Sequence, residues 1–210
     1  GLAGATGAAA QPSAKPAPKP KAGAPDVAVV GSGVFGAFTA LSLRERGLSV
    51  LALDQYGPAS PRASSSGETR SIRAGYGELG FYSAWSMQAL AMWKAREADF
   101  GRQLLFPNAR LELAQRWTPG LTAQKAIFER LNLPYEVADR EALRRRYPQM
   151  AFDDVEFAFV ETAASAAVIK AREAVLATMD VFARKGGAFR FARTVPGRAE
   201  GRRLTHLALD

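Results

Sequence analysis

Apolar and polar positions alternate in blocks along residues 26–54. Residues 26–30 form a short aliphatic run, which predicts a buried strand of the kind found in parallel sheets. Apolar residues at helical spacing follow over residues 34–46, and Gly47 predicts the C-terminal end of that helix. Residues 48–53 are again almost continuously apolar and predict a second strand. The order strand, helix, strand predicts a βαβ unit with parallel strands.

Four later segments have the spacing of amphipathic helices, at residues 81–100, 120–131, 140–146 and about 168–185. Asp139 predicts an N-cap for the third of them. The expected core-facing stripe of the first is Phe81, Trp85, Ala89 and Met92. The expected stripe of the last is Val168, Ala171, Val175, Met179 and Phe182.

Extended patterns separate these helices. Strands are predicted at residues 104–106, 110–114, 155–160, 188–195 and 204–209. The first two flank Pro107 and Asn108, which predicts a hairpin. The strand, helix, strand order of residues 155–195 predicts a second crossover that extends the first sheet.

A glycine-rich turn lies between the first strand and the first helix. Gly31, Gly33 and Gly36 give the pattern G-x-G-x-x-G. In such a turn the first glycine permits a tight bend and the second lets a diphosphate approach the backbone. The third lets the helix pack close to the strand.

The ends of the neighbouring elements support the same interpretation. The first helical N–H groups, at Val34 and Phe35, have no intrahelical partner and favour an anion. Asp54 ends the second strand 23 positions after Gly31, near the ~20 typical of the acid that binds an adenosine ribose. Together these features predict a dinucleotide site, whereas a merely structural glycine turn is the alternative.

The loop after Asp54 carries a second motif. Ser65 and Glu68 have the spacing of a capping box, which predicts a short helix beginning at Ser65. We expect the free N–H groups of that helix to point toward the same ligand. Arg70 and Arg73 would then share one helix face, since they are three positions apart.

Composition excludes several classes of protein. The 210 residues contain no cysteine, which excludes disulfides, thiolate metal sites and a cysteinyl cofactor link within this stretch. No apolar run reaches the ~18 residues of a membrane span, and no metal site is expected. The net charge of +8 fits an anionic ligand or an ordinary solvated surface, and no nucleic-acid-binding motif is present.

Residues 1–25 are rich in Ala, Gly, Pro and Lys and contain no aromatic residue, so they are predicted to be disordered. Ala8–Ala10 resemble a signal-peptide cleavage site. The sequence leaves two alternatives open, which are export by a twin-arginine route and a cytoplasmic location.

The two motifs together resemble the FAD-dependent enzymes of the D-amino-acid oxidase superfamily, most of all the branch of monomeric sarcosine oxidase and N-methyl amino acid oxidases. That branch has a G-[DE]-T-R-x-I-R element, which is matched here by Gly67, Glu68, Thr69, Arg70, Ile72 and Arg73. The resemblance covers residues 27 to about 209 and corresponds to the N-terminal half of such an oxidase. The chain is therefore expected to be a fragment.

The resemblance implies an α/β fold, with a Rossmann-like FAD-binding domain and an inserted, incomplete α+β substrate domain. It places residues 26–102 and 158–210 in the FAD-binding domain and residues 103–157 in the substrate domain. FAD is the implied cofactor. The residues implied to contact it are Gly31, Gly33, Val34, Phe35, Gly36, Asp54, Ser65, Ser66, Thr69, Arg70 and Val195.

The resemblance also implies a reaction. An amino acid or N-alkyl amino acid would be oxidised at its C–N bond to an imine, with oxygen reduced to hydrogen peroxide. Arg70 would lie near the flavin ring, and Arg73 would bind the substrate carboxylate, which the guanidinium fork matches. Two alternatives remain, a flavin dehydrogenase with another electron acceptor and a non-catalytic FAD-binding subunit. His206, the single histidine, is expected to be a surface or structural residue.

Overall fold

A computed structural model describes residues 23–210, so the prediction for the tail falls almost wholly outside the described residues. The predicted βαβ unit is confirmed. β1 (Val27–Val30) and β2 (Val50–Asp54) are parallel, and β9 (Ala188–Phe191) adds a third parallel strand beside β2. The resulting sheet has the order β1-β2-β9.

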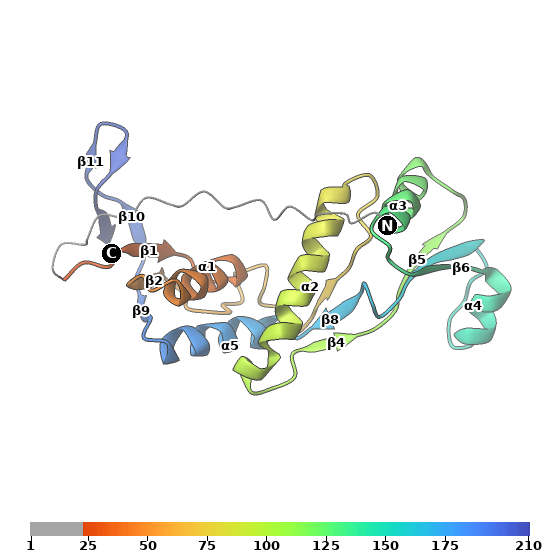
Figure 1. Cartoon of the computed structure of the whole chain (residues 1–210), viewed down its shortest axis with the longest axis horizontal. Helices are drawn as coiled ribbons and strands as arrows, with labels where there is room; N and C mark the ends of the chain where they lie inside the picture. Colours follow the sequence, from red (N-terminus) through yellow and green to blue (C-terminus); the bar gives the residue numbers. More distant parts are fainter. Residues whose placement is uncertain (1–22) are drawn as a thin grey trace, which may run out of the picture.

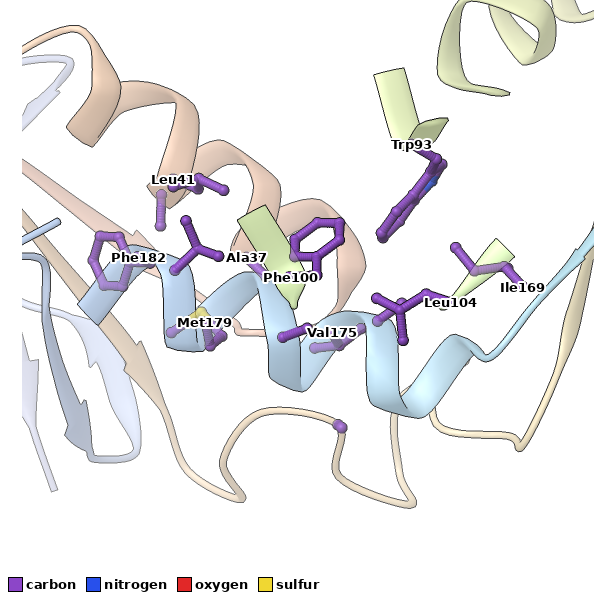
Figure 2. Packing of buried hydrophobic residues seen from close by; sticks show 14 of the residues in the cluster. Ala37, Leu41, Trp93, Phe100, Leu104, Ile169, Val175, Met179 and Phe182 are labelled. Atoms are coloured by element: carbon purple, nitrogen blue, oxygen red, sulfur yellow. The ribbon is translucent and has the colours of Figure 1, made fainter. Parts of the chain in front are cut away.

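Helices α1 (Val34–Glu45) and α5 (Ala171–Arg184) pack against each other beside this sheet (Figure 1). The small residues Ala37 and Ala40 of α1 are fully buried and permit a close approach. Figure 2 shows Leu41 of α1 and Phe182 of α5 meeting in the core between the helices. The buried stripe predicted for α5 is confirmed from Ala171 to Phe182.

The prediction for α2 (Gly80–Phe100) was right about the helix and wrong about its buried face. Phe81, Trp85 and Met92 are 51%, 63% and 43% exposed. The helix instead buries Leu90, Trp93 and Phe100, which pack into the same core as α1 and α5 (Figure 2). Aromatic and aliphatic residues lie on two faces of this helix, so spacing alone did not identify the buried one.

A second sheet is antiparallel and has the order β3-β8-β4. Its strands are β3 (Arg70–Ile72), β8 (Ala167–Ile169) and β4 (Leu105–Pro107). The predicted hairpin at Pro107–Asn108 is wrong, because β4 pairs with β8 while the following strand joins a different sheet. Val168 belongs to β8 and not to the α5 stripe. The second crossover predicted for residues 155–195 is wrong in its first strand, which pairs antiparallel in another sheet, whereas β9 does extend the parallel sheet.

The third sheet, also antiparallel, has the order β5-β7-β6 and lies at the opposite end of the molecule from the parallel sheet (Figure 1). Its strands are β5 (Arg110–Ala114), β7 (Phe157–Glu161) and β6 (Tyr135–Asp139). Helix α3 (Pro119–Arg130) contributes Phe128 to a core with Phe159, and α4 (Arg140–Arg146) contributes Leu143 to a core with Ala158 and Val160. Since successive side chains alternate between faces, β7 is covered on both sides.

The C-terminal segment forms two short antiparallel pairs. β10 (Thr194–Pro196) pairs with β13 (Leu207–Leu209), and β11 (Ala199–Glu200) pairs with β12 (Arg203–Leu204). Asp139 caps α4 by accepting a hydrogen bond from the N–H of Ala142 at 2.8 Å, as predicted. None of the helices within residues 23–210 combines the length and apolar character that a membrane crossing requires. The predicted α/β class with a Rossmann-like unit is confirmed.

Candidate functional site

The glycine turn that connects β1 to α1 is tightly packed, backbone against backbone. Gly31 has a φ of +95°, and its N–H donates to the carbonyl of Leu53 in β2 at 2.7 Å. A Cβ atom added at Gly36 would lie 1.8 Å from the carbonyl oxygen of Gly31. The third glycine of the motif is therefore required by direct backbone contact.

Two adjoining hollows open at this turn, at the carboxyl ends of the parallel strands. Their volumes are about 450 Å³ and 310 Å³, and both are lined by Val30, Gly31, Gly33 and Ala63. This edge of an open parallel sheet is where such folds bind their ligands. Among the predicted residues, the larger hollow adds Asp54, and the smaller one adds Val34, Phe35, Gly36 and Ser65.

The N-terminus of α1 opens on the smaller hollow. The N–H of Val34 donates to the hydroxyl of Ser65 at 3.2 Å, so a side chain from a distant loop caps the helix. Phe35 is 88% exposed, and Gly36 lies one residue further along the same turn. Phe35 and Gly36 line this hollow together with Val34, so the positive end of the α1 dipole lies beside it.

Asp54 is held by the backbone on both sides of its carboxylate. Oδ2 accepts from the N–H of Ser32 at 2.7 Å, while Oδ1 accepts from the N–H groups of Tyr56 and Gly57 at 2.7 and 2.9 Å. Partial burial favours the neutral form, but these hydrogen bonds outweigh it and hold the pKa of Asp54 below its ordinary value. The side chain is therefore an oriented anion at the mouth of the larger hollow.

Asp54→Asn is expected to lower the stability of the protein at pH 7 by about 1 kcal/mol, because an amide cannot accept all three hydrogen bonds. A carboxylate with a lowered pKa stabilises the fold above its unfolded pKa of about 3.9, and this contribution is lost as the pH falls through the folded value. Denaturant unfolding between pH 7 and pH 3 should show the two proteins converging at acidic pH. A constant difference across this range would contradict the prediction.

Residues 60–69 form turns and bends, so the short helix predicted at Ser65 and Glu68 is wrong. The carbonyls of Gly67 and Glu68 instead accept hydrogen bonds from the N–H groups of Arg172 and Ala171, at 3.2 and 3.0 Å. These donors belong to the first turn of α5. The loop therefore caps two existing helices, α1 through the Ser65 side chain and α5 through its backbone.

Ser66 and Thr69 do not line either hollow. The hydroxyl of Ser66 donates to the carbonyl of Ala63 at 2.6 Å, and the carbonyl of Thr69 accepts from Arg70 at 2.8 Å. In this structure both residues shape the loop. Their predicted contacts to a cofactor stay predictions.

Arg70 lies in β3, and Arg73 follows directly after it, so the helical face predicted for them is wrong. Nε and Nη2 of Arg70 donate to the carbonyl of Ser64 at 3.1 and 2.6 Å. Nε of Arg73 donates to the carbonyl of Gly75 at 3.0 Å, and its guanidinium lies 4.7 Å from the ring centre of Tyr76. Each arginine is thus positioned by backbone carbonyls close to it in sequence.

The lining of the larger hollow includes residues that the sequence did not single out. Arg193 and Thr194 contribute to it, whereas the predicted Val195 does not. Arg62 also lines it, with its guanidinium 4.4 Å from the ring centre of Tyr56. The strand predicted near residues 193–195 pointed to this part of the chain, but the sequence did not show which of its residues would line the hollow. His206 is exposed, as expected of a surface residue, and contacts the Thr205 hydroxyl.

Residues 26–208 match the sequence model of the FAD dependent oxidoreductase (DAO) family. Peroxisomal sarcosine oxidase of Mus musculus is 30% identical over 162 residues, which are 77% of this chain and 41% of that protein. N-methyl-L-tryptophan oxidase of Yersinia pestis is 28% identical over 136 residues, which are 65% and 37%. The chain spans less than half the length of these relatives.

Solved structures share the fold. L-proline dehydrogenase from P. horikoshii superposes with a TM-score of 0.74 at 16% identity, over 87% of this chain and 48% of that one. NikD, an amino acid oxidase of nikkomycin biosynthesis, superposes with a TM-score of 0.67 at 22% identity, over 82% and 45%. At these identities the likeness concerns the fold alone.

Proposed function

The chain belongs to the FAD dependent oxidoreductase family, and from this premise we propose that the protein oxidises the C–N bond of an amino acid or N-alkyl amino acid to an imine. We further propose that oxygen is the electron acceptor and hydrogen peroxide the second product. The names of the relatives, sarcosine oxidase and N-methyl-L-tryptophan oxidase, support a small amine that carries a carboxylate.

The observation that carries this proposal is the fit of the glycine turn to a diphosphate. The first helical residues of α1 line the smaller hollow, where a helix N-terminus favours an anion, and Gly36 allows the helix to start directly against Gly31. Asp54 stands at the larger hollow, where an adenosine ribose would reach its carboxylate. We therefore assign Gly31, Gly33, Val34, Phe35, Gly36 and Asp54 to the ADP half of FAD, with Ser65, Ser66, Thr69 and Val195 as further candidates.

When bound, FAD would supply the electron-accepting group that no side chain of the chain provides. The protein then has to bind FAD and the substrate, orient them toward each other and stabilise the charge that develops. Arg70 is the candidate for a cation near the flavin ring, and Arg73 is the candidate for the substrate carboxylate. Both side chains are already fixed by backbone carbonyls, which favours a preformed site.

We propose the same domain division as the sequence indicates. Residues 26–102 and 158–210 would form the FAD-binding domain and residues 103–157 the substrate domain. The parallel sheet is built wholly from the first group, while the third sheet takes two of its three strands from the second. Strand β7 crosses from one group to the other.

The test uses the complete polypeptide that contains this chain. It is expected to purify with a flavin absorbance spectrum, or to acquire one when FAD is added. Turnover is then measured with sarcosine, N-methyl-L-tryptophan, glycine and L-proline, each beside its carboxamide, with oxygen consumption and peroxide recorded. Failure to bind FAD would overturn the proposal. FAD binding with turnover only in the presence of an artificial electron acceptor would make the protein a dehydrogenase.

A further inference from the structure

Glu161 is a fully buried carboxylate at the end of β7, with 0% of its surface exposed. Its Oε1 atom lies 2.6 Å from Nη1 of Arg110 in β5. Its Oε2 atom accepts from the backbone N–H groups of Ala74 and Gly75, at 2.8 and 3.2 Å. A buried charge requires such partners, since transfer from water is costly. The carboxylate therefore joins the third sheet to the backbone that follows Arg73.

A second set of hydrogen bonds, through Glu112 and Gln124, reaches the backbone after Arg73. Nη1 of Arg110 also contacts Glu112 at 3.0 Å, and the amide nitrogen of Gln124 donates to Glu112 at 3.0 Å. The amide oxygen of Gln124 accepts from the N–H of Gly77 at 3.2 Å. Burial opposes the charge on Arg110, but its hydrogen bonds to Glu161 and Glu112 prevail and raise its pKa. The polar cluster thus holds residues 74–77 at two points, through Glu161 at Ala74 and Gly75 and through Gln124 at Gly77.

The contact at Gly75 leaves no space for a side chain. A Cβ atom there would lie 2.5 Å from Oε1 of Glu161 and 2.8 Å from the amide oxygen of Gln124. The carbonyl of the same Gly75 accepts the hydrogen bond from Nε of Arg73. The segment Ala74–Gly75 therefore donates its two N–H groups to Glu161, and the carbonyl of Gly75 accepts a hydrogen bond from Arg73.

We propose that Glu161 and Arg110 are positioning residues for Arg73, which fix the place of its guanidinium and thereby the affinity for the substrate carboxylate. This inference rests on the proposed function, in which Arg73 binds that carboxylate. Glu161 and Arg110 contact the protein and not the substrate. Their effect passes through the backbone of Ala74 and Gly75.

Glu161→Gln is the informative substitution, because it keeps the shape of the side chain. A glutamine has one oxygen for two sets of donors, so its NH₂ group must face either Arg110 or the backbone N–H groups. We expect the segment after Arg73 to lose its fixed position. In the FAD-loaded complete polypeptide, the Kd for acetate, measured by calorimetry, should rise about tenfold, while the affinity for acetamide stays unchanged.

Kinetics give a second measurement. The KM for the best carboxylate substrate of the panel above should rise about tenfold and kcat should change by less than about threefold, with little change for its carboxamide. In a background of Arg73→Ala, Glu161→Gln should have no further effect on acetate affinity, since coupled residues are not additive.

A control removes another arginine–carboxylate pair, which is partly exposed and lies elsewhere in the fold. Glu45 contacts Arg96 at 2.6 Å and joins α1 to α2, far along α1 from the glycine turn. Glu45→Gln should change stability but leave acetate affinity unaltered. If Glu161→Gln does not fold, Arg110→Lys keeps the charge but replaces the planar guanidinium, whose Nη1 contacts both Glu161 and Glu112, with a shorter ammonium side chain. It should raise the acetate Kd in the same direction.

Unchanged acetate affinity in a folded, FAD-loaded Glu161→Gln or Arg110→Lys protein would overturn the inference and leave the proposed function intact. An equal loss of acetate and acetamide affinity would also overturn it, because it would indicate general damage to the site. A wild-type protein that binds no FAD would instead remove the proposed function, and the inference would fall with it.

Discussion

Gly36→Ala is expected to destabilise the glycine turn and to weaken FAD binding strongly. The new Cβ atom would lie 1.8 Å from the carbonyl oxygen of Gly31 and 2.8 Å from its carbonyl carbon, and no rotamer change can relieve a clash with backbone. The turn must open, which we expect to cost about 3 kcal/mol of stability. Since the turn shapes the hollow, FAD affinity should fall about 100-fold or more. Thermal unfolding and titration with FAD measure the two effects.

Gly120→Ala is the matched control for this substitution. Gly120 also lies in the first turn of a helix, α3, but its added Cβ would only approach the Thr118 hydroxyl at 3.9 Å. It should leave stability and FAD affinity near those of the wild type. If Gly36→Ala binds FAD as tightly as Gly120→Ala does, the close contact between helix and turn is not needed for the site.

Arg73→Ala is expected to raise the KM for a carboxylate-bearing substrate about 100-fold, because a charge-assisted, bidentate partner is removed. The carboxamide of the same substrate should be affected by less than about threefold, since it carries no charge for the guanidinium. Steady-state kinetics of the FAD-loaded complete polypeptide, with both substrates, measure the difference.

The control for the arginine is Arg102→Ala. Arg102 forms an exposed ion pair with Asp180 at 3.4 Å and lines neither hollow of the candidate site. Its loss should leave both KM values unchanged. Equal losses for the carboxylate and the carboxamide in Arg73→Ala would mean that Arg73 supports the site without binding the carboxylate.

Much of the fold follows from local sequence. The βαβ unit was predictable because its strands are continuously apolar and its glycines occupy fixed places in the turn. The buried face of α5 was predictable because its apolar residues lie on one side. The three-residue strands β3 and β8 were missed, since so few residues give no periodicity.

The site was less accessible to sequence reasoning, because its contacts join distant residues. Ser65 has the spacing of a local capping box, yet its hydroxyl caps a helix that begins 31 positions earlier. Glu161 directly follows the apolar strand predicted at residues 155–160, and nothing near it in sequence indicates a partner at Arg110 or at Gly75. Such contacts depend on how strands from different segments are brought together.

The pairing of β2 with β9 has a consequence for biosynthesis. Leu51 lies opposite Ala188, so the third strand of the parallel sheet leaves the ribosome only after α2 and both antiparallel sheets have been made. Contacts so distant in sequence form slowly, because a long loop must close first. The nascent chain must therefore carry β2 with an open edge while residues 55–187 are synthesised, and chaperones that shield exposed strands should engage it in this interval.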